Sequence, residues 1–300
     1  MYPKNRAGHS SPLLTIAIPN RNQLNGLVLQ EETLRKVSRH GDIQILVSDN
    51  HSNDNSAEYL QANWSDFSSV SLLRENVGIA GNLRNLTLSA SGEWIWFIGS
   101  GDLPDLSSIQ PLLELLSIAD SNVSIVLFDG AYECIQPFLG GSLYRRRSLI
   151  SVIESDTDEV WPHVSWSIEI ELSNPMADVI KSPLIEIEPW TSSDDWHSRK
   201  AMFPYAESLN KVLYLGFQRN PKSQRLRNDL MESEKTLLTW YIQDRLSGKI
   251  TGLNRNLVSS IRNSGKASEY LFLKLLAISI SLVPYGILRR LKLILNSLQR

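Results

Sequence analysis

The sequence predicts an α/β protein with a mostly parallel central sheet, followed by a helical C-terminal region. Short apolar segments alternate with segments of helical periodicity along the first 130 residues, which is the pattern of strands joined by crossover helices. The run Trp94-Ile95-Trp96-Phe97-Ile98 is typical of a central parallel strand that is covered on both faces. Because the connections are short, we expect right-handed crossovers between neighbouring parallel strands.

The composition is that of an ordinary globular protein. The 300 residues, 42% of them apolar and 21% charged, suffice for one large domain and a smaller region. A net charge of −2 argues against a general nucleic-acid binder. The single cysteine, Cys134, excludes internal disulfides and multi-cysteine zinc sites. No hydrophobic signal segment opens the chain, so we expect a cytoplasmic location.

The first part of the chain is expected to hold four strands separated by three helices. Pro19 ends the first strand and Gly41 ends the first helix, because proline cannot donate to a sheet and glycine often follows the last turn of a helix. The expected strands are 13–18, 43–47, 70–73 and 94–98, and the expected helices are 24–40, 56–67 and 78–90.

The pattern is less regular beyond residue 102. Asp105 is expected to cap a helix that contains Leu112 to Leu116, and Pro162 to open a later helix. The remaining expected strands are 123–128, 137–144 and 179–187. The expected divisions are a flexible N-terminus over 1–12, an α/β domain over 13–200 with halves 13–130 and 131–200, and a helical region over 201–300.

Four blocks of the sequence carry a family resemblance. They are residues 14–22 (LTIAIPNRN), 47–54 (VSDNHSND), 76–82 (NVGIAGN) and 91–98 (SGEWIWFI). Their order and spacing closely resemble the successive blocks of inverting family 2 glycosyltransferases with the GT-A fold, over roughly residues 13 to 130. The resemblance implies a Rossmann-like GT-A domain that moves a sugar, with inversion, from a nucleotide-diphosphate donor of UDP or dTDP type. It also implies a glycan or lipid-linked acceptor, a divalent metal and a role in surface polysaccharide biosynthesis.

The resemblance also suggests which residues bind the nucleotide. Asp49 follows the second strand and is expected to accept hydrogen bonds from the base or ribose, with a simple Asx turn as the alternative. Asp54 is either a second contact or a helix cap. Gly78 opens a helix whose N–H groups favour phosphate, and Arg84 either neutralises a phosphate or faces solvent. The full expected set is Pro19, Asn20, Asn22, Asp49, Asn50, Asp54, Gly78, Asn82 and Arg84.

The metal motif departs from the family pattern. Where the family has Asp-x-Asp, this chain has Ser100-Gly101-Asp102. Asp102 is the expected ligand of Mn²⁺ or Mg²⁺, because such an ion can be held by one or two carboxylates together with substrate phosphates. Ser100 weakens this expectation. Ser100 and Gly101, together with Arg145 and Arg146, are expected to contact phosphate or acceptor, the arginines through a diphosphate of the donor or of a lipid-linked acceptor.

An inverting transfer needs a base for the acceptor hydroxyl, and several residues are candidates. His163 is one because imidazole titrates near neutral pH; the alternative is a histidine packed at a helix end. Asp158 and Glu159 are the other two favoured candidates for the base. They belong to an acidic run, for which a solvent-exposed surface loop is the alternative interpretation. Glu154, Asp156, Glu133 and Asp129 remain open for similar reasons.

The C-terminal segment suggests a membrane surface. Residues 271–288 are apolar but interrupted by Pro284, short of the roughly 20 residues that span a bilayer. A basic amphipathic stretch follows over 289–298. We expect residues 268–300 either to lie peripherally on the inner face of the cell membrane or to pack on the catalytic domain.

Two other functions fit parts of the sequence. The first is a non-catalytic GT-A-like module, for nucleotide-sugar binding or membrane docking, that lost its chemistry when the first acid became Ser100. The second is a nucleotidyltransferase, which shares the acids at strand ends. It is disfavoured because no glycine-rich loop with a basic residue follows the first strand.

Overall fold

The computed structural model describes residues 11–128, 132–133, 135, 137–155, 161–174, 178–182, 187–188 and 203–247. The strands are β1 (Leu14–Asn20), β2 (Ile43–Asp49), β3 (Ser69–Leu72), β4 (Trp94–Phe97), β5 (Leu103–Pro104), β6 (Val123–Phe128), β7 (Ser142–Arg145), β8 (Asp178–Ser182) and β9 (Ile187–Glu188). The helices are α1 (Leu24–Val37), α2 (Ser56–Asn63), α3 (Gly78–Ser89), α4 (Leu106–Ile118), the 3₁₀ turn η1 (Leu139–Gly141), α5 (Arg146–Ile150), α6 (Pro162–Ser173), α8 (Phe203–Arg219) and α9 (Gln224–Ser247).

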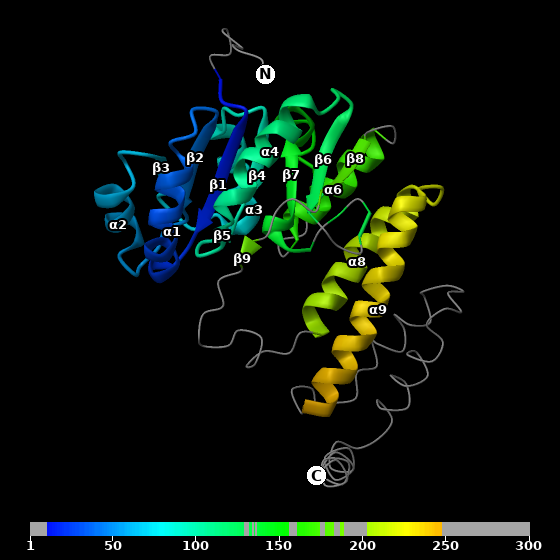
Figure 1. Ribbon diagram of the computed structural model, residues 1–300. Helices are drawn as coiled ribbons and strands as arrows, with labels where there is room; N and C mark the ends of the chain where they lie inside the picture. Colours follow the sequence, from blue (N-terminus) through cyan, green and yellow to red (C-terminus); the bar gives the residue numbers. More distant parts are fainter. Residues whose placement is uncertain are drawn as a thin grey trace, which may run out of the picture. The chain divides into compact units, whose positions relative to one another are not determined.

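Seven of the strands form one twisted sheet in the order β3-β2-β1-β4-β7-β6-β8 (Figure 1). Only β7 runs against its neighbours in this sheet, pairing antiparallel with β4 and with β6. The mostly parallel sheet expected from the sequence is confirmed. Asn20 at the end of β1 pairs with Asp49 at the end of β2, so the loops that follow these strands leave the sheet at the same edge.

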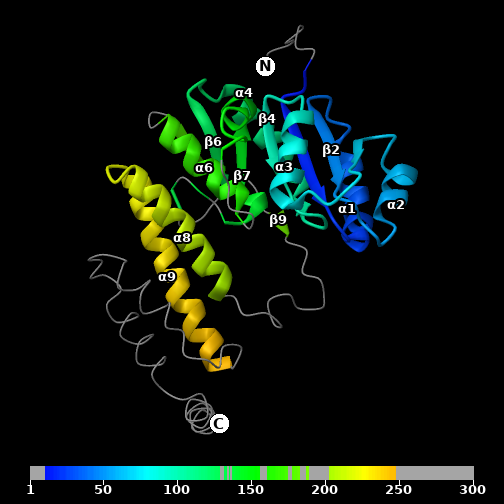
Figure 2. The same ribbon diagram turned by 180° about the vertical axis from the view of Figure 1, so that it is seen from behind.

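Helices cover both faces of the sheet, as the two opposite views show (Figures 1 and 2). One face packs against α1, α2 and α4 through a core that includes Leu27, Trp64 and Leu112. The other packs against α3, α5 and α6 through Leu86 and Trp166, among others. The chain therefore buries both sheet faces in two apolar layers.

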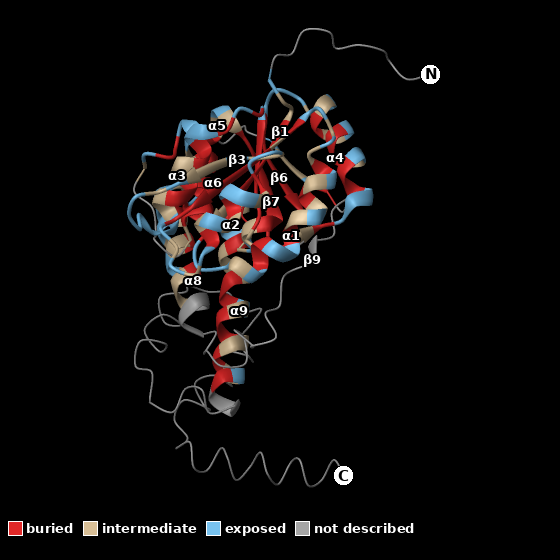
Figure 3. Cartoon of the chain, turned by 90° about the vertical axis from the view of Figure 1, so that its left-hand side faces the viewer, coloured by how far each residue is buried: buried red, intermediate tan, exposed pale blue. Residues whose placement is uncertain are grey.

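Strand β4 lies in the centre of this arrangement, and all four of its residues are buried. Alternate side chains of a strand point to opposite faces, so Trp94 and Trp96 enter the first core and Ile95 and Phe97 the second. The indole N–H of Trp96 donates to the carbonyl of Gly140 at 2.8 Å. Coloured by burial, the strands at the centre of the sheet are buried, and exposed residues lie on the outer sides of the helices (Figure 3).

Element ends differ from expectation where local hydrogen bonds tighten the chain. Helix α1 ends at Val37 rather than at residue 40, because the N–H groups of Arg39 and His40 bond three residues back in a 3₁₀-type turn. The expected strand over 137–144 is a 3₁₀ turn followed by β7, since glycines at 140 and 141 disfavour strand. The single strand expected over 179–187 is wrong: β8 and β9 belong to different sheets.

Contacts divide the chain into two units, residues 1–190 and 191–300. In the second unit α8 and α9 pack against each other, and Leu213 and Tyr241 are buried. Helical structure after residue 203 agrees with the sequence pattern. Among the described residues, no helix is both long and apolar enough to cross a membrane. The stretches 271–288 and 289–298 lie outside the described residues.

Candidate functional site

Asn20 joins three loops at the carboxyl edge of the sheet. Its side chain is buried, with 1% of the residue exposed. The amide Nδ2 donates to Asp49 Oδ1 at 2.7 Å, and the amide Oδ1 accepts from the hydroxyl of Ser100 at 3.0 Å. The same hydroxyl lies 3.1 Å from the carbonyl oxygen of Pro19. Residues from the ends of β1, β2 and β4, expected from the sequence to share one edge, are thus brought together.

Asp49 is tied into its own loop. Its Oδ1 accepts from the Ser52 hydroxyl at 2.6 Å, and its Oδ2 accepts from the Ser52 N–H at 2.9 Å. His51 sits between them with a φ of 58°, a left-handed conformation. This is the local turn that the sequence offered as an alternative, while a nucleotide contact of Asp49 stays a prediction.

Asn50 links the loop after β2 to the start of α3. Its Nδ2 donates to Asn76 Oδ1 at 2.9 Å and to the Gly78 carbonyl at 3.0 Å, and its Oδ1 accepts from the Val77 N–H at 2.9 Å. Gly78 has a φ of 74°, which side chains with a Cβ rarely adopt. Asn50 and Gly78 therefore set the entry of α3.

Asn82 places an unsatisfied polar atom at the same edge. The residue is 2% exposed, and its Nδ2 donates to the carbonyl of Ser48 at 3.3 Å. Its Oδ1 is buried and has no hydrogen-bond partner in the described part of the chain. An unpaired buried acceptor of this kind costs about 1–3 kcal/mol.

Two further residues from the expected nucleotide set, Asn22 and Asp54, have structural partners. Asn22, with a φ of 53°, accepts from the Asn53 N–H at 2.8 Å. Asp54 accepts from the first N–H of α1, at Leu24, and from the Ser56 N–H. Burial opposes ionisation of Asp54, but hydrogen bonds from Ser56 and Leu24 outweigh it and hold the pKa of this carboxyl below its ordinary value.

Arg84 was expected to neutralise a phosphate or to face solvent, and in the structure its guanidinium contacts the backbone instead. Its Nε and Nη2 donate to the carbonyl of Ile153 at 3.1 and 2.9 Å, and Glu154 lies 3.8 Å away. The guanidinium thus fastens α3 to the end of the segment that contains α5, because a carbonyl ending a helical turn is a ready acceptor.

The loop 99–102 is held by a buried glutamine of α1. Gln30 is fully buried, and its Nε2 donates to the carbonyls of Gly99 and Asp102 at 2.7 and 2.6 Å. Gly101 has a φ of 101°, as expected of glycine in a tight turn. A Cβ on Gly26 would lie 2.7 Å from the Ser100 carbonyl oxygen, so α1 and this loop are in close contact.

Asp102 faces the interior of the same loop and is 8% exposed. Its Oδ2 accepts from the N–H of Gly99 at 2.9 Å. A carboxylate offers about four lone-pair sites, so a carboxylate that accepts a hydrogen bond can also coordinate a cation. Within the described ranges no three His, Cys, Asp or Glu side chains cluster as a metal site. Asp102 in this loop offers one carboxylate, which fits a cation that completes its shell with water and phosphate.

Arg145 and Arg146 do not lie at this edge, so they are away from the proposed donor phosphates; contact with a diphosphate of a lipid-linked acceptor, the other partner expected for them, stays a prediction. Arg145 pairs with Trp94, the first residue of β4, whereas Asp102 follows the last. Arg145 is 5% exposed; it donates to the carbonyls of Val123 and Asp120 and pairs with Glu93. The antiparallel course of β7 is the reason, because it carries residue 145 to the amino end of its parallel neighbour.

His163 opens α6 in a buried position, with 4% of the residue exposed. Its Nε2 lies 3.1 Å from the carbonyl oxygen of Pro137. A carbonyl only accepts, so Nε2 carries the proton in this contact. This geometry matches the packed histidine that was the alternative to a base. Asp158 and Glu159 lie outside the described residues, as do Asp156 and Asp129.

Asp105, close to the metal-binding loop in sequence, has the capping role expected for it. Asp105 caps α4, accepting from the Ser107 N–H, and hydrogen bonds from Ser107 hold the pKa of this carboxyl below its ordinary value. That cap is confirmed.

Gln30 was not predicted as a site residue, although it interrupts the apolar stripe of Leu27, Leu34 and Val37 on α1. A polar residue in such a stripe signals a buried hydrogen-bond partner.

One family model matches the chain. The model of "Glycosyl transferase family 2" matches residues 15–161. No curated protein sequence matches the chain significantly.

Three solved structures with the same fold illustrate its range. A mannosyltransferase from Pyrobaculum calidifontis, in complex with GDP-Man and Mn²⁺, is 15% identical with a TM-score of 0.55 over 92% of this chain and 83% of its own. S. aureus TarS 1–349, in complex with UDP-GlcNAc, is 11% identical with a TM-score of 0.54 over 84% and 87%. Glucosyl-3-phosphoglycerate synthase from Mycobacterium tuberculosis, with Mn²⁺, UDP and phosphoglyceric acid, is 14% identical with a TM-score of 0.52 over 70% and 78%.

Proposed function

Because residues 15–161 belong to glycosyl transferase family 2, we propose that this glycosyltransferase takes its sugar from a UDP- or dTDP-linked donor held at the carboxyl edge of the sheet. The observation that carries the proposal is the meeting of Asn20, Asp49 and Ser100 at that edge, with Asp102 in the adjoining loop. In open α/β sheets, ligands bind outside the carboxyl ends of the strands.

Asp102 is the proposed ligand of a divalent metal, Mn²⁺ or Mg²⁺. When bound, the ion would neutralise the charge that develops on the departing diphosphate. The protein's own contribution is positional: Gln30 holds the backbone on both sides of the loop, and Gly99 orients the carboxylate. Solved structures of the same fold with Mn²⁺ and nucleotide support a metal at this kind of site.

Transfer with inversion is proposed to proceed by direct displacement, which requires a base for the acceptor hydroxyl. Asp158 and Glu159 are the better candidates, because Nε2 of His163 is engaged as a donor to the Pro137 carbonyl. The proposed acceptor is a glycan or lipid-linked intermediate of surface polysaccharide synthesis. The basic amphipathic sequence over 289–298 supports attachment to a membrane surface, where such acceptors lie.

Thermal unfolding in the presence of nucleotides tests the donor site. UDP, dTDP and GDP would each be added with Mn²⁺, with Mg²⁺ and with chelator. A nucleotide at 100 times its dissociation constant is expected to stabilise the protein by about 2.7 kcal/mol, only when metal is present and not in Asp102→Ala. If a well-folded sample shows no shift with any nucleotide, the proposed donor site is wrong and a non-catalytic module becomes the better description.

Substitution of Gln30 tests how the metal-binding loop is positioned. In Gln30→Leu the carbonyls of Gly99 and Asp102 lose their shared donor, so the Mn²⁺ concentration needed for half-maximal nucleotide binding should rise about tenfold or more. Gln61→Leu, on an exposed position of α2, is the matched control and should leave the Mn²⁺ requirement unchanged. If folded Gln30→Leu needs the same Mn²⁺ concentration as the unchanged protein, Gln30 contributes to packing and does not position the metal-binding loop.

A further inference from the structure

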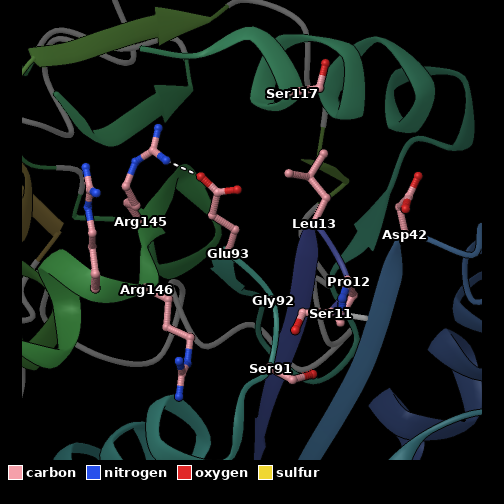
Figure 4. Close-up of a pocket in the computed structure, with 11 residues that line it drawn as sticks. Ser11, Pro12, Leu13, Asp42, Ser91, Gly92, Glu93, Ser117, Arg145 and Arg146 are labelled. Carbon is pink, nitrogen blue, oxygen red and sulfur yellow. Dashed lines mark hydrogen bonds and ion pairs between the residues drawn. The ribbon is translucent and has the colours of Figure 1, made fainter. Parts of the chain in front are cut away.

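A pocket lies at the amino edge of the sheet, away from the site described above. It has a volume of about 460 Å³ and is enclosed by the segment 11–13 before β1, the turn Ser91–Glu93 before β4, and the arginines 145–147. Figure 4 shows these side chains arranged around the amino ends of the strands. We call it the amino-edge pocket. Strand β1 separates the two edges by its seven residues, which is roughly 20 Å.

The three arginines of the amino-edge pocket differ in how far they are neutralised. The guanidinium of Arg145 donates hydrogen bonds to Glu93 and to three backbone carbonyls. Its carbon atom also lies 4.3 Å from the centre of the Trp94 ring. Arg147 donates to the carbonyl of Ser121. Arg146 is half-buried, and its guanidinium forms no hydrogen bond or ion pair with any residue that the structure describes; its Nε is shielded from solvent and unpartnered.

The acids of the pocket leave the charge of Arg146 uncompensated. Glu93 points to Arg145 and is paired with it, as the dashed line in Figure 4 marks. Asp42 is exposed and lies on the β2 side of the pocket, while Arg146 extends from the α5 side. The nearby main-chain donors are occupied as well: the N–H of Gly92 bonds Thr15, and the N–H of Arg146 bonds the Glu93 carbonyl. An incoming ligand therefore meets a cation as its main polar partner.

We propose that the amino-edge pocket binds a phosphate-type oxyanion through Arg146, with Arg147 beside it. A guanidinium presents several donors in a planar fork that matches phosphate oxygens. Leaving a buried donor of a charged group unpaired is costly, and an anion in contact with the guanidinium offsets that cost. The phosphate belongs either to a soluble anion or to an anionic lipid headgroup. This site is separate from the donor site and does not depend on the proposed transfer.

Binding measurements with inorganic phosphate test the proposal on the full-length protein. Calorimetric titration at constant ionic strength should show saturable binding, weakened at least tenfold in Arg146→Gln and partly retained in Arg146→Lys. Arg39→Gln, an exposed arginine of the same unit, is the control and should bind as the unchanged protein does. Asp102→Ala should also bind phosphate unchanged, which distinguishes this site from the donor site.

Vesicles distinguish the two sources of phosphate. Co-sedimentation with phosphatidylcholine vesicles containing phosphatidylglycerol, lost in Arg146→Gln and displaced by inorganic phosphate, would identify a lipid headgroup. Phosphate binding without sedimentation would identify a soluble anion. The proposal is overturned if neither probe binds, or if folded Arg146→Gln binds both as well as the unchanged protein does. Failure of the nucleotide experiment would not affect either result.

Discussion

Replacement of Asp102 by asparagine is expected to lower kcat/KM about 100-fold or more while leaving the fold intact. Asparagine keeps the size of the side chain and an oxygen that accepts from the Gly99 N–H, but it removes the negative charge. In the part of the chain that the structure describes, no cluster of acids is available to replace it. A loss of 100-fold corresponds to about 2.7 kcal/mol, within the several kcal/mol that a positioned cation contributes.

Asp105→Asn provides the matched control for this measurement. Asp105 lies three residues further on and caps α4 through Ser107 and Ser108, so its replacement should cost about 1 kcal/mol of stability with unchanged kcat/KM. Steady-state rates with sugars linked to the nucleotide that the unfolding panel identifies would be compared across a Mn²⁺ titration. A decrease of less than threefold in Asp102→Asn would contradict the assignment of Asp102 as the metal ligand.

Arg145→Ala is expected to destabilise the protein by about 3 kcal/mol. The substitution leaves the carbonyls of Val123 and Asp120 without their donor and removes the stacking on Trp94, each loss being worth about 1 kcal/mol. For a unit of this size the midpoint of thermal unfolding should fall by about 6–12 °C.

Urea denaturation of the purified variant measures this effect directly. Arg147→Ala is the control because Arg147 is exposed and bonds a single carbonyl, so we expect a loss below about 1 kcal/mol. A loss equally small in Arg145→Ala would mean that the contacts of Arg145 contribute little to stability, and would reopen a ligand-binding role for this arginine.

Local sequence patterns predicted the elements that depend on local contacts. The buried run at 94–98 identified the central strand, and polar residues after two strands identified the edge where Asn20 and Asp49 meet. The insertion of β7 between β4 and β6 was not predictable in this way, because it depends on pairing between segments distant in sequence. For the same reason, the sequence did not show at which edge of the sheet Arg145 lies.

Side-chain partners were the harder part of the site to predict. The nine residues expected to bind nucleotide include Asn50 and Asp54, whose hydrogen bonds serve the loops themselves. Sequence position placed them at the correct edge but did not distinguish a ligand contact from a loop contact, because short polar side chains satisfy both. Gln30, in contrast, carries a local signal, since it interrupts an apolar helix stripe.

The bond between Ser100 and Asn20 implies that these two positions evolve as a pair. The Ser100 hydroxyl faces two acceptors, the Pro19 carbonyl and the Asn20 side-chain oxygen. An aspartate at 100 cannot donate to either, and turning the Asn20 amide to meet it would sacrifice the bond to Asp49. Relatives with an acid at position 100 should therefore carry a different residue at position 20. An alignment of homologous sequences would test whether the two positions change together.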